Sequence, residues 1–182
     1  MPCASDSYAV QRIIHAANAR WELEAIDYRP KDKALFLRVG APEEAIDALV
    51  SDIVATWEED STLIDGNSLW PDIHEFAWVP PNHAIAKVTI TSQRVHSLTK
   101  ALATIGIDQD HLHLSAEGAQ GWLAIPEDVN WDHLNQQLTS LLLSGLAFRG
   151  KAPTMWIGER HSHPDGTALA KVFDSDVKFL SM

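Results

Sequence analysis

The order of strand-like and helical segments between residues 84 and 150 limits the possible folds more than any other feature of this sequence. Apolar residues alternate in the strand-like segments and recur at helical spacing in the others. Ser92 and Asn130 precede the helical segments and suit the N-cap, because their side chains accept hydrogen bonds from free backbone N–H groups. In order, we expect a strand at 84–91, a helix at 92–105, strands at 111–116 and 122–125, a helix at 130–143 and a strand at 146–149.

Strand, helix, strand, strand, helix, strand is the arrangement called ferredoxin-like. The first part of the chain has the same order without its opening strand. It comprises a helix at 8–17, strands at 21–28 and 34–39, a helix at 42–57 and a strand at 61–64. We therefore predict an α+β fold in which duplicated ferredoxin-like units form a largely antiparallel sheet of about seven strands. The main helices are expected on one face of that sheet.

Both half-repeats, at about 8–65 and 84–150, are expected to belong to a single domain over residues 1–182. The connector at 66–83 is expected to be irregular, because glycine and proline residues interrupt it. They are Gly66, Pro71, Pro80 and Pro81. The tail at 151–182 is expected to end in a short helix and an extended segment.

Charge and composition exclude several classes of partner. The chain carries 25 acidic and 14 basic residues, a formal net charge of -11, which opposes attraction to nucleic acid or to an anionic membrane surface. No apolar stretch approaches the roughly 20 residues that span a bilayer, so we expect no membrane insertion. Cys3 is the only cysteine, and an internal disulfide is therefore impossible. A reducing, cytoplasmic location is the expectation.

Five phrases, taken in order, resemble the C-terminal domain of FAD-linked oxidases of the vanillyl-alcohol-oxidase type. They are ALFLRVGAPEEAIDALVSDI, SLWPDIHEF, AIAKVTITSQRV, EGAQGWLAIP and LAKVFDSDVKFL. The resemblance covers nearly the whole chain and is greatest to the FAD-binding subunit of bacterial glycolate oxidases. The ending departs from the family, since Asp174-Ser175 stands where Asp-Pro is usual. The family's FAD-binding domain precedes this region, and the first half here shows no glycine-rich phosphate loop.

The resemblance implies a substrate-side cap domain of an FAD-dependent oxidoreductase that oxidises a small 2-hydroxy acid such as glycolate. FAD would be held by the missing domain or by a partner, because hydride chemistry belongs to the flavin. The implied partners are an FAD-binding domain or other oxidase subunits, together with a small carboxylate substrate. Alone, the chain is expected to be inactive. The alternative is a non-catalytic assembly protein that keeps the duplicated fold, which an exposed apolar sheet face or a stable homodimer would favour.

Four residues are candidates for substrate binding. The resemblance implies that the connector faces the flavin and the substrate, which marks Trp70 and His74. Lys87 and Arg94 flank the strand-to-helix turn of the second half, where a cation could bind a small anion. Packing at a domain surface explains the first pair equally, and solvated charge explains the second. No catalytic group and no residue that binds a cofactor can be named from the sequence.

Two histidine pairs are possible metal ligands. His111-Leu112-His113 places two imidazoles on one face of a strand, where they can share a metal, although a solvated strand face explains them too. His161 and His163 precede Asp165 in a turn, which suits either a divalent cation or a polar loop. Because neither pair has a third ligand at a defined spacing, the sequence assigns no metal site.

Overall fold

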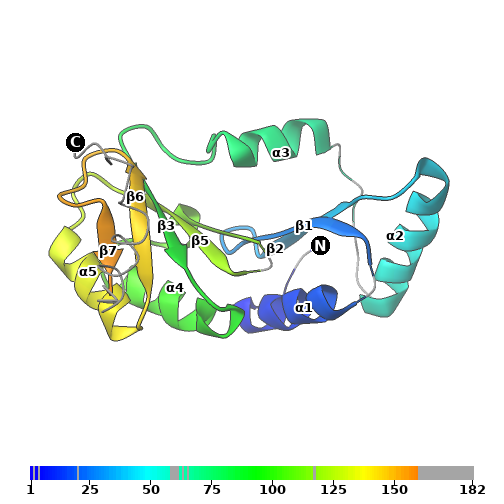
Figure 1. Ribbon diagram of the computed structural model, residues 1–182, viewed down its shortest axis with the longest axis horizontal. Coiled ribbons are helices and arrows are strands. Elements are labelled where there is room, and N and C mark those ends of the chain that lie inside the picture. The colour runs from blue at the N-terminus through cyan, green and yellow to red at the C-terminus, as the bar shows by residue number, and fades with distance from the viewer. Residues whose placement is uncertain are drawn as a thin grey trace, which may run out of the picture.

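A single antiparallel sheet organises the computed structural model, which describes residues 1, 3, 5–19, 21–57, 62, 64, 66–116 and 118–159. Its seven strands follow the order β2-β1-β4-β5-β3-β6-β7, and every neighbouring pair is antiparallel (Figure 1). The strands are β1 Leu23–Arg29, β2 Ala34–Val39, β3 Ala84–Thr89, β4 Leu112–Ser115, β5 Gln120–Ile125, β6 Ser144–Arg149 and β7 Trp156–Gly158. The predicted α+β class and the seven-stranded antiparallel sheet are confirmed.

The second half has the predicted ferredoxin-like connectivity. Its strands lie in the order β4-β5-β3-β6. Helix α4, Val95–Ala103, connects β3 to β4, and helix α5, Trp131–Ser140, connects β5 to β6. The Asn130 side chain accepts the N–H groups of Asp132 and His133, as expected of an N-cap. Ser92 does not cap α4 as predicted; it begins a short 3-10 turn, Ser92–Arg94, and α4 starts after that turn.

The first half differs from the prediction in one strand. Helix α1, Asp6–Asn18, precedes the hairpin β1–β2, and helix α2, Glu43–Trp57, follows it. The strand expected at 61–64 is wrong for the described residues there, since Thr62 and Ile64 lie outside any strand. The seventh strand is instead β7, which pairs with β6 and buries Ile157 opposite Gly145. A three-residue strand is too short to show an alternation in the sequence.

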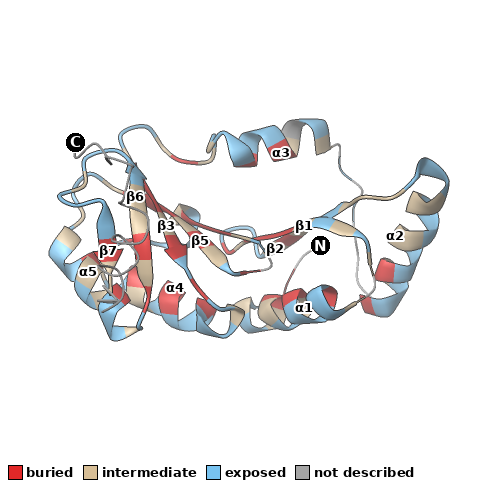
Figure 2. Ribbon diagram, in the orientation of Figure 1, coloured by how far each residue is buried: buried red, intermediate tan, exposed pale blue. Residues whose placement is uncertain are grey.

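Helices α1, α4 and α5 cover one face of the sheet, called the helix face here (Figure 1). Their apolar sides and alternate residues of the strands form the main core, because side chains of a strand alternate between its two faces. Its fully buried members include Ile13, Tyr28, Leu98, Leu102, Leu112, Leu114, Leu123, Ile125, Leu134 and Leu138. Buried residues gather in these strands and helices, whereas α2 and α3 are mainly exposed or half-buried (Figure 2).

Helix α3, Gly66–His74, corrects the prediction that the connector is irregular throughout. It lies on the other side of the sheet, called the α3 face here (Figure 1). Pro71 lies inside the helix and removes one backbone donor, which costs about 3 kcal/mol in a helix interior. Trp70 and Ile73 are buried against the rest of the molecule, and burial of two large side chains offsets a cost of that size. After α3 the connector is irregular, as predicted.

No helix in the described ranges is long and apolar enough to cross a membrane.

Candidate functional site

A row of polar and aromatic side chains crosses the α3 face of the sheet. Lys87 of β3 is paired in register with Trp122 of β5, and Trp122 is paired with His113 of β4. Directly paired residues project to the same face, so the three side chains lie side by side. The Lys87 ammonium lies 5.4 Å from the centroid of the Trp122 ring, at cation–π distance. A half-buried cation is therefore held against Trp122, and Trp122 separates it from the imidazole of His113.

Asp27 joins this row through His113. The Nε2–H group of His113 donates to Oδ2 of Asp27 over 2.8 Å. Only 1% of the His113 side chain and 6% of the Asp27 side chain are exposed. The two residues are separated by 86 positions and come from β1 and β4, the strands where the half-repeats meet. Removing charge from water is costly, and a carboxylate–imidazole pair this deeply buried is a candidate for function rather than for stability.

Residues 76–82, called the roof segment here, cover the row. Trp78 lies over His113 with ring centroids 5.8 Å apart, and Phe76 contacts Trp122 edge-on at 4.9 Å. Val79 is buried with Ile85 and Ala124 in a small apolar cluster separate from the main core. Phe76 and Asn82 bracket the roof segment, with φ angles of 58° and 66°. Such left-handed backbone is uncommon for residues other than glycine, and for phenylalanine it is strained.

Two buried polar atoms, one in the roof segment and one beneath it, have no hydrogen-bond partner in the described part of the chain. They are Nδ1 of His113 and Nε1 of Trp78. A buried unsatisfied polar group costs about 1–3 kcal/mol, and each such group in a native protein calls for an explanation. Both atoms belong to rings that contact one another. Nδ1 of His113 and Nε1 of Trp78 could therefore each form one more hydrogen bond than the described residues provide.

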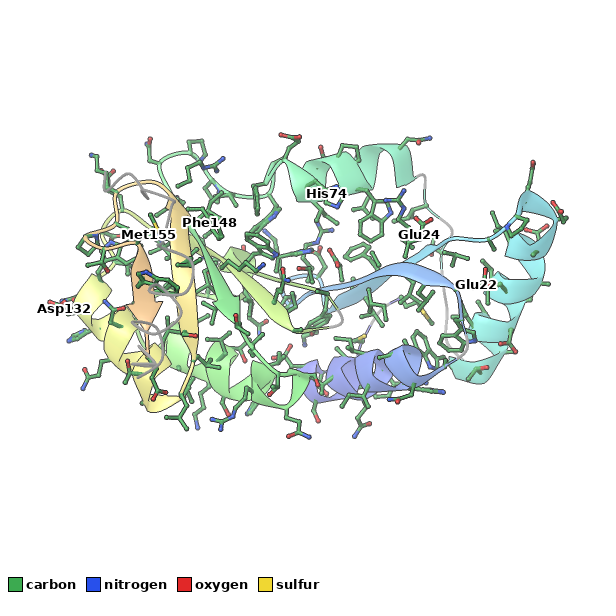
Figure 3. All side chains as sticks on the ribbon, in the orientation of Figure 1. Glu22, Glu24, His74, Asp132, Phe148 and Met155 are labelled. Carbon is green, nitrogen blue, oxygen red and sulfur yellow. The ribbon has the colours of Figure 1, made fainter. Side chains whose placement is uncertain are left out.

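Two of the predicted substrate-binding residues, Trp70 and His74, lie together elsewhere. Both are on α3, with ring centroids 6.5 Å apart. They line a groove of about 750 Å³ between α3, α2 and the free edge of β2. Trp70 is buried and His74 is exposed, on the side of α3 toward the sheet (Figure 3). The groove is mainly apolar, and its lining includes Leu35, Leu37, Val39, Ile46, Val50, Ile53, Val54, Ile64 and Leu69.

The other two predicted residues are separated from this groove and from one another. Lys87 belongs to the row on the α3 face, as described above. Arg94 lies in the 3-10 turn before α4, and its Nη1 donates to the carbonyl of Leu141 over 3.0 Å. Leu141 follows the last turn of α5, where a cation satisfies free carbonyls and complements the helix dipole. The structure thus gives Arg94 a helix-capping contact and does not bring the four residues into one site.

The histidines considered as metal ligands have different partners. His111 lies in the 3-10 turn Gln109–His111, hydrogen-bonds Asp108 through Nδ1 at 2.6 Å, and stacks on His83 with centroids 5.1 Å apart. His113 is paired with Asp27 instead. Among the described residues, no group of three histidine, cysteine or acidic side chains is arranged to hold a metal ion. His161 and His163 lie outside the described residues.

Asp27 is the site residue that sequence reasoning missed. In the strand Leu23–Arg29, Ile26 and Tyr28 point into the main core, and Asp27 between them points to the opposite face. By itself, that alternation predicts that Asp27 is an ordinary acidic side chain exposed to solvent. Its burial depends on a partner in another strand and on the roof segment, neither of which the local pattern contains. The combination of a cation, an unpaired imidazole nitrogen and a carboxylate can bind a small anion and accept a proton.

A comparison with models of known protein families finds no match for this chain, and comparisons with curated proteins and with solved structures find none either.

Proposed function

We propose that this chain is the substrate-side module of an FAD-dependent oxidoreductase that acts on a small 2-hydroxy acid such as glycolate. The supporting observation is the row on the α3 face, where Lys87 lies beside Trp122 and the Asp27–His113 pair completes the row. Lys87 is the group that binds the carboxylate, since an ammonium attracts a small anion in a partly desolvated site.

FAD is held by a separate domain or partner subunit in this proposal. The α3 face offers a surface that suits a flat ring system brought by such a domain. Trp122 and Phe148 have ring centroids 5.8 Å apart, and 59% of Phe148 is exposed. Planar apolar contacts of this kind favour stacking on an aromatic ligand. The flavin supplies the hydride acceptor when bound, and the residues of this chain bind and orient the acid.

Reconstitution tests the proposal. The purified chain is mixed with the FAD-binding domain of a glycolate-oxidase-type enzyme from which its own cap has been removed, and reduction of a redox dye is followed with glycolate. We expect the mixture to reduce the dye and each component alone to be inactive. Lys87→Gln lowers kcat/KM by about tenfold or more, the loss typical of one charge-assisted contact. Lys100→Gln, an exposed lysine on α4, is the matched control and leaves the rate unchanged.

Two results contradict this function. Stoichiometric flavin on the purified chain would make it a flavoprotein in its own right. If the mixture forms a stable complex but does not reduce the dye with glycolate, the row on the α3 face does not bind the substrate.

A second function, assembly with other subunits without catalysis, is supported by exposed apolar side chains on β6, on β7 and just before β7. Phe148, Met155 and Trp156 are 59%, 66% and 56% exposed, and Phe148 and Met155 lie near one another at the same end of the molecule (Figure 3). A large exposed apolar patch is typical of an interaction surface. Light scattering during gel filtration tests this version: a stable oligomer that Phe148→Glu dissociates favours it. Ile14→Glu, on the exposed side of α1, is the control.

A further inference from the structure

We propose that the free edge of β2 binds an extended peptide segment of another polypeptide, which pairs antiparallel with Leu37 and Val39 and extends the sheet by one strand. The groove between α2 and α3 receives the side chains of that segment. The inference does not involve the row on the α3 face. It goes beyond the proposed function and does not depend on it.

The first residues of the chain already pair with the beginning of this edge. The N–H group of Leu35 donates to the carbonyl of Met1 over 2.8 Å, and the amino group of Met1 donates to the carbonyl of Leu35 over 2.9 Å. Such a double exchange is the hydrogen-bonded pair of an antiparallel ladder. The N–H group of Cys3 donates to the carbonyl of Lys33 in the same ladder. An antiparallel pairing is therefore in place along residues 33–35 of the free edge.

Leu37 and Val39 carry the backbone groups that would continue this pairing. Within a strand, the N–H and C=O groups of every second residue point to the same side. Those of Leu35 point to the free edge, whereas Phe36 is paired with β1. The groups of Leu37 and Val39 therefore point to the free edge as well, and no described strand pairs with them there. Unpaired backbone groups along an apolar groove are a template for another strand.

The second half of the molecule shows what covers the equivalent edge. In the shared helix–strand–strand–helix order β2 corresponds to β5, and each is antiparallel to the strand before it. The other side of β5 is covered by β3, which is antiparallel to β5. Met1 and Cys3 have the same direction relative to β2. A strand beside β2 repeats a pairing that the molecule already contains, which favours a peptide over a small apolar molecule.

The α2 wall of the groove requires apolar side chains at alternate positions of the segment. Directly paired residues project to the same face of a sheet. The residues opposite Leu37 and Val39 therefore project to the side on which these two pack against the main core. The apolar residues of α2 that line the groove are Ile46, Val50, Ile53 and Val54. Ile53 belongs to the same core, so apolar side chains at these two positions extend it.

Arg38 requires an acidic residue between the two apolar ones. Its side chain projects to the face opposite that of Leu37, because neighbours in a strand alternate. Nε of Arg38 pairs with Glu24 over 2.8 Å, and a guanidinium has five N–H donors, so donors remain for a second carboxylate. Opposite charges placed directly across two strands attract each other. The chemistry of the segment is therefore apolar, acidic, apolar in an extended conformation.

Amide hydrogen exchange followed by nuclear magnetic resonance tests the inference on the whole chain. The probe is an acetylated and amidated peptide with valine, glutamate and valine at its centre, threonine on either side and lysine at both ends. We expect saturating peptide to slow the exchange of Leu37 and Val39 by about tenfold or more. Phe36 is the internal reference, because it is already paired with Asp27, and its exchange rate stays unchanged.

Two altered peptides identify the mode of binding. N-methylation of the valine opposite Leu37 removes its donor, so binding is expected to weaken by about tenfold. Exchanging the glutamate for lysine places like charges opposite one another at Arg38 and is expected to weaken binding by about threefold. A peptide of the same composition with its valines adjacent puts them on opposite faces and controls for attraction by charge alone.

Three variants of the chain locate the site. Leu37→Pro removes the free-edge donor and keeps the pairing of β1 with β2, since the N–H group of Leu37 points away from β1. We expect a folded variant, checked by circular dichroism, that binds the peptide about tenfold more weakly. Val50→Glu puts a charge into the apolar wall and has a similar effect. Ala48→Glu, at an exposed position of the same helix, leaves the affinity unchanged.

Several outcomes overturn the inference. One is a peptide that leaves the exchange of Leu37 and Val39 unchanged at about 1 mM, and another is equal binding of the N-methylated peptide. If dodecanoate shifts the signals of the groove and the peptide does not, the groove takes a small apolar molecule. If light scattering shows a dimer of the chain alone that Leu37→Pro dissociates, the occupant is a second copy.

Discussion

The two halves of the molecule share a helix–strand–strand–helix order and differ in what lies beside the hairpin. In the second half, β3 lies against the outer side of β5, and the sheet continues through β6 to β7. In the first half no described strand lies on the free side of β2, and the groove that contains Trp70 and His74 occupies that place. The consequence is visible in burial: Leu123, Ala124 and Ile125 of β5 are fully buried, whereas β2 buries only Leu35. The presence or absence of a strand next to the hairpin thus decides whether its second strand is buried, as β5 is, or lies at an edge of the sheet, as β2 does.

The sharpest way to test this comparison is one leucine deletion in each hairpin. Leu123→Ala removes a fully buried side chain from β5 and is expected to cost about 3–4 kcal/mol, because the surrounding core cannot collapse around the cavity. Leu37→Ala, in half-buried β2, is expected to cost about 1 kcal/mol. Urea unfolding of both variants gives the two values. Equal costs would mean that the first half is packed as tightly as the second.

Substitutions in the Asp27–His113 pair, which joins the two halves, should have the next largest effect on the free energy of unfolding. Asp27→Ala leaves His113 buried without its partner and is expected to lower the free energy of unfolding by about 2–3 kcal/mol. The double variant Asp27→Leu with His113→Leu is expected to cost less than Asp27→Ala alone, because no buried polar group is left unpaired. Glu24→Ala removes the exposed pair with Arg38 and serves as the control, with about 0.5 kcal/mol. A double variant that is less stable than Asp27→Ala would show that the pair itself stabilises the fold.

Alanine substitutions at Gly145 and Gly40 test how much space for a Cβ atom each half of the molecule leaves at a glycine. A Cβ at Gly145 of β6 would collide with the carbonyl oxygen of Lys87 in the neighbouring strand, so Gly145→Ala is expected to cost about 2 kcal/mol. A Cβ at Gly40 would meet the exposed Glu24 side chain at 2.5 Å, which can rotate away, so Gly40→Ala is expected to cost less than about 0.5 kcal/mol. Thermal unfolding monitored by circular dichroism distinguishes them. A larger loss in Gly40→Ala would reverse the comparison.

Alkaline pH should lower the stability of the chain through a tyrosine of the first half. Both tyrosines of the chain lie there, and Tyr28 is fully buried with its hydroxyl donating to Asp6 at 2.7 Å. Burial, and then the hydrogen bond to Asp6, raise the pKa of Tyr28 above its usual value of 10.0. Because the folded state holds this proton more tightly, its contribution to stability is complete below pH 10 and is lost as the pH rises above that value.

Tyr28→Phe is the variant that checks this pH dependence. It is expected to cost about 1 kcal/mol at neutral pH through the lost hydrogen bond. Above pH 10 the variant should lose stability less steeply than the wild type, by up to about 1.4 kcal/mol per pH unit. Urea unfolding between pH 8 and about pH 11 follows both proteins. Parallel slopes would indicate that Tyr28 does not control the alkaline loss.

Prediction from sequence succeeded where the signal is local and failed where it is not. The alternation and helical spacing of residues 84–150 are strong enough to give both helices and all four strands of that half, and Asn130 caps α5 as expected. The connector was misread because Pro71 was taken as a break, although burial of Trp70 and Ile73 holds α3 together. The short strand β7 carries too few residues to show an alternation. Of the candidate site, Lys87 was recognised and Asp27 was not.

The sequence by itself determined the α+β class, the antiparallel sheet and the order of elements in residues 84–150, because each follows from periodicities and turn residues within short windows. Tertiary structure alone decided which strand becomes the seventh, where the open edge lies, and which polar residues come together. Asp27 and His113 meet because the two halves pair along β1 and β4, with 86 residues between them. Their burial under Trp78 comes from a connector that crosses the sheet. Such contacts depend on long-range pairing and on the packing of whole elements, which no local pattern encodes.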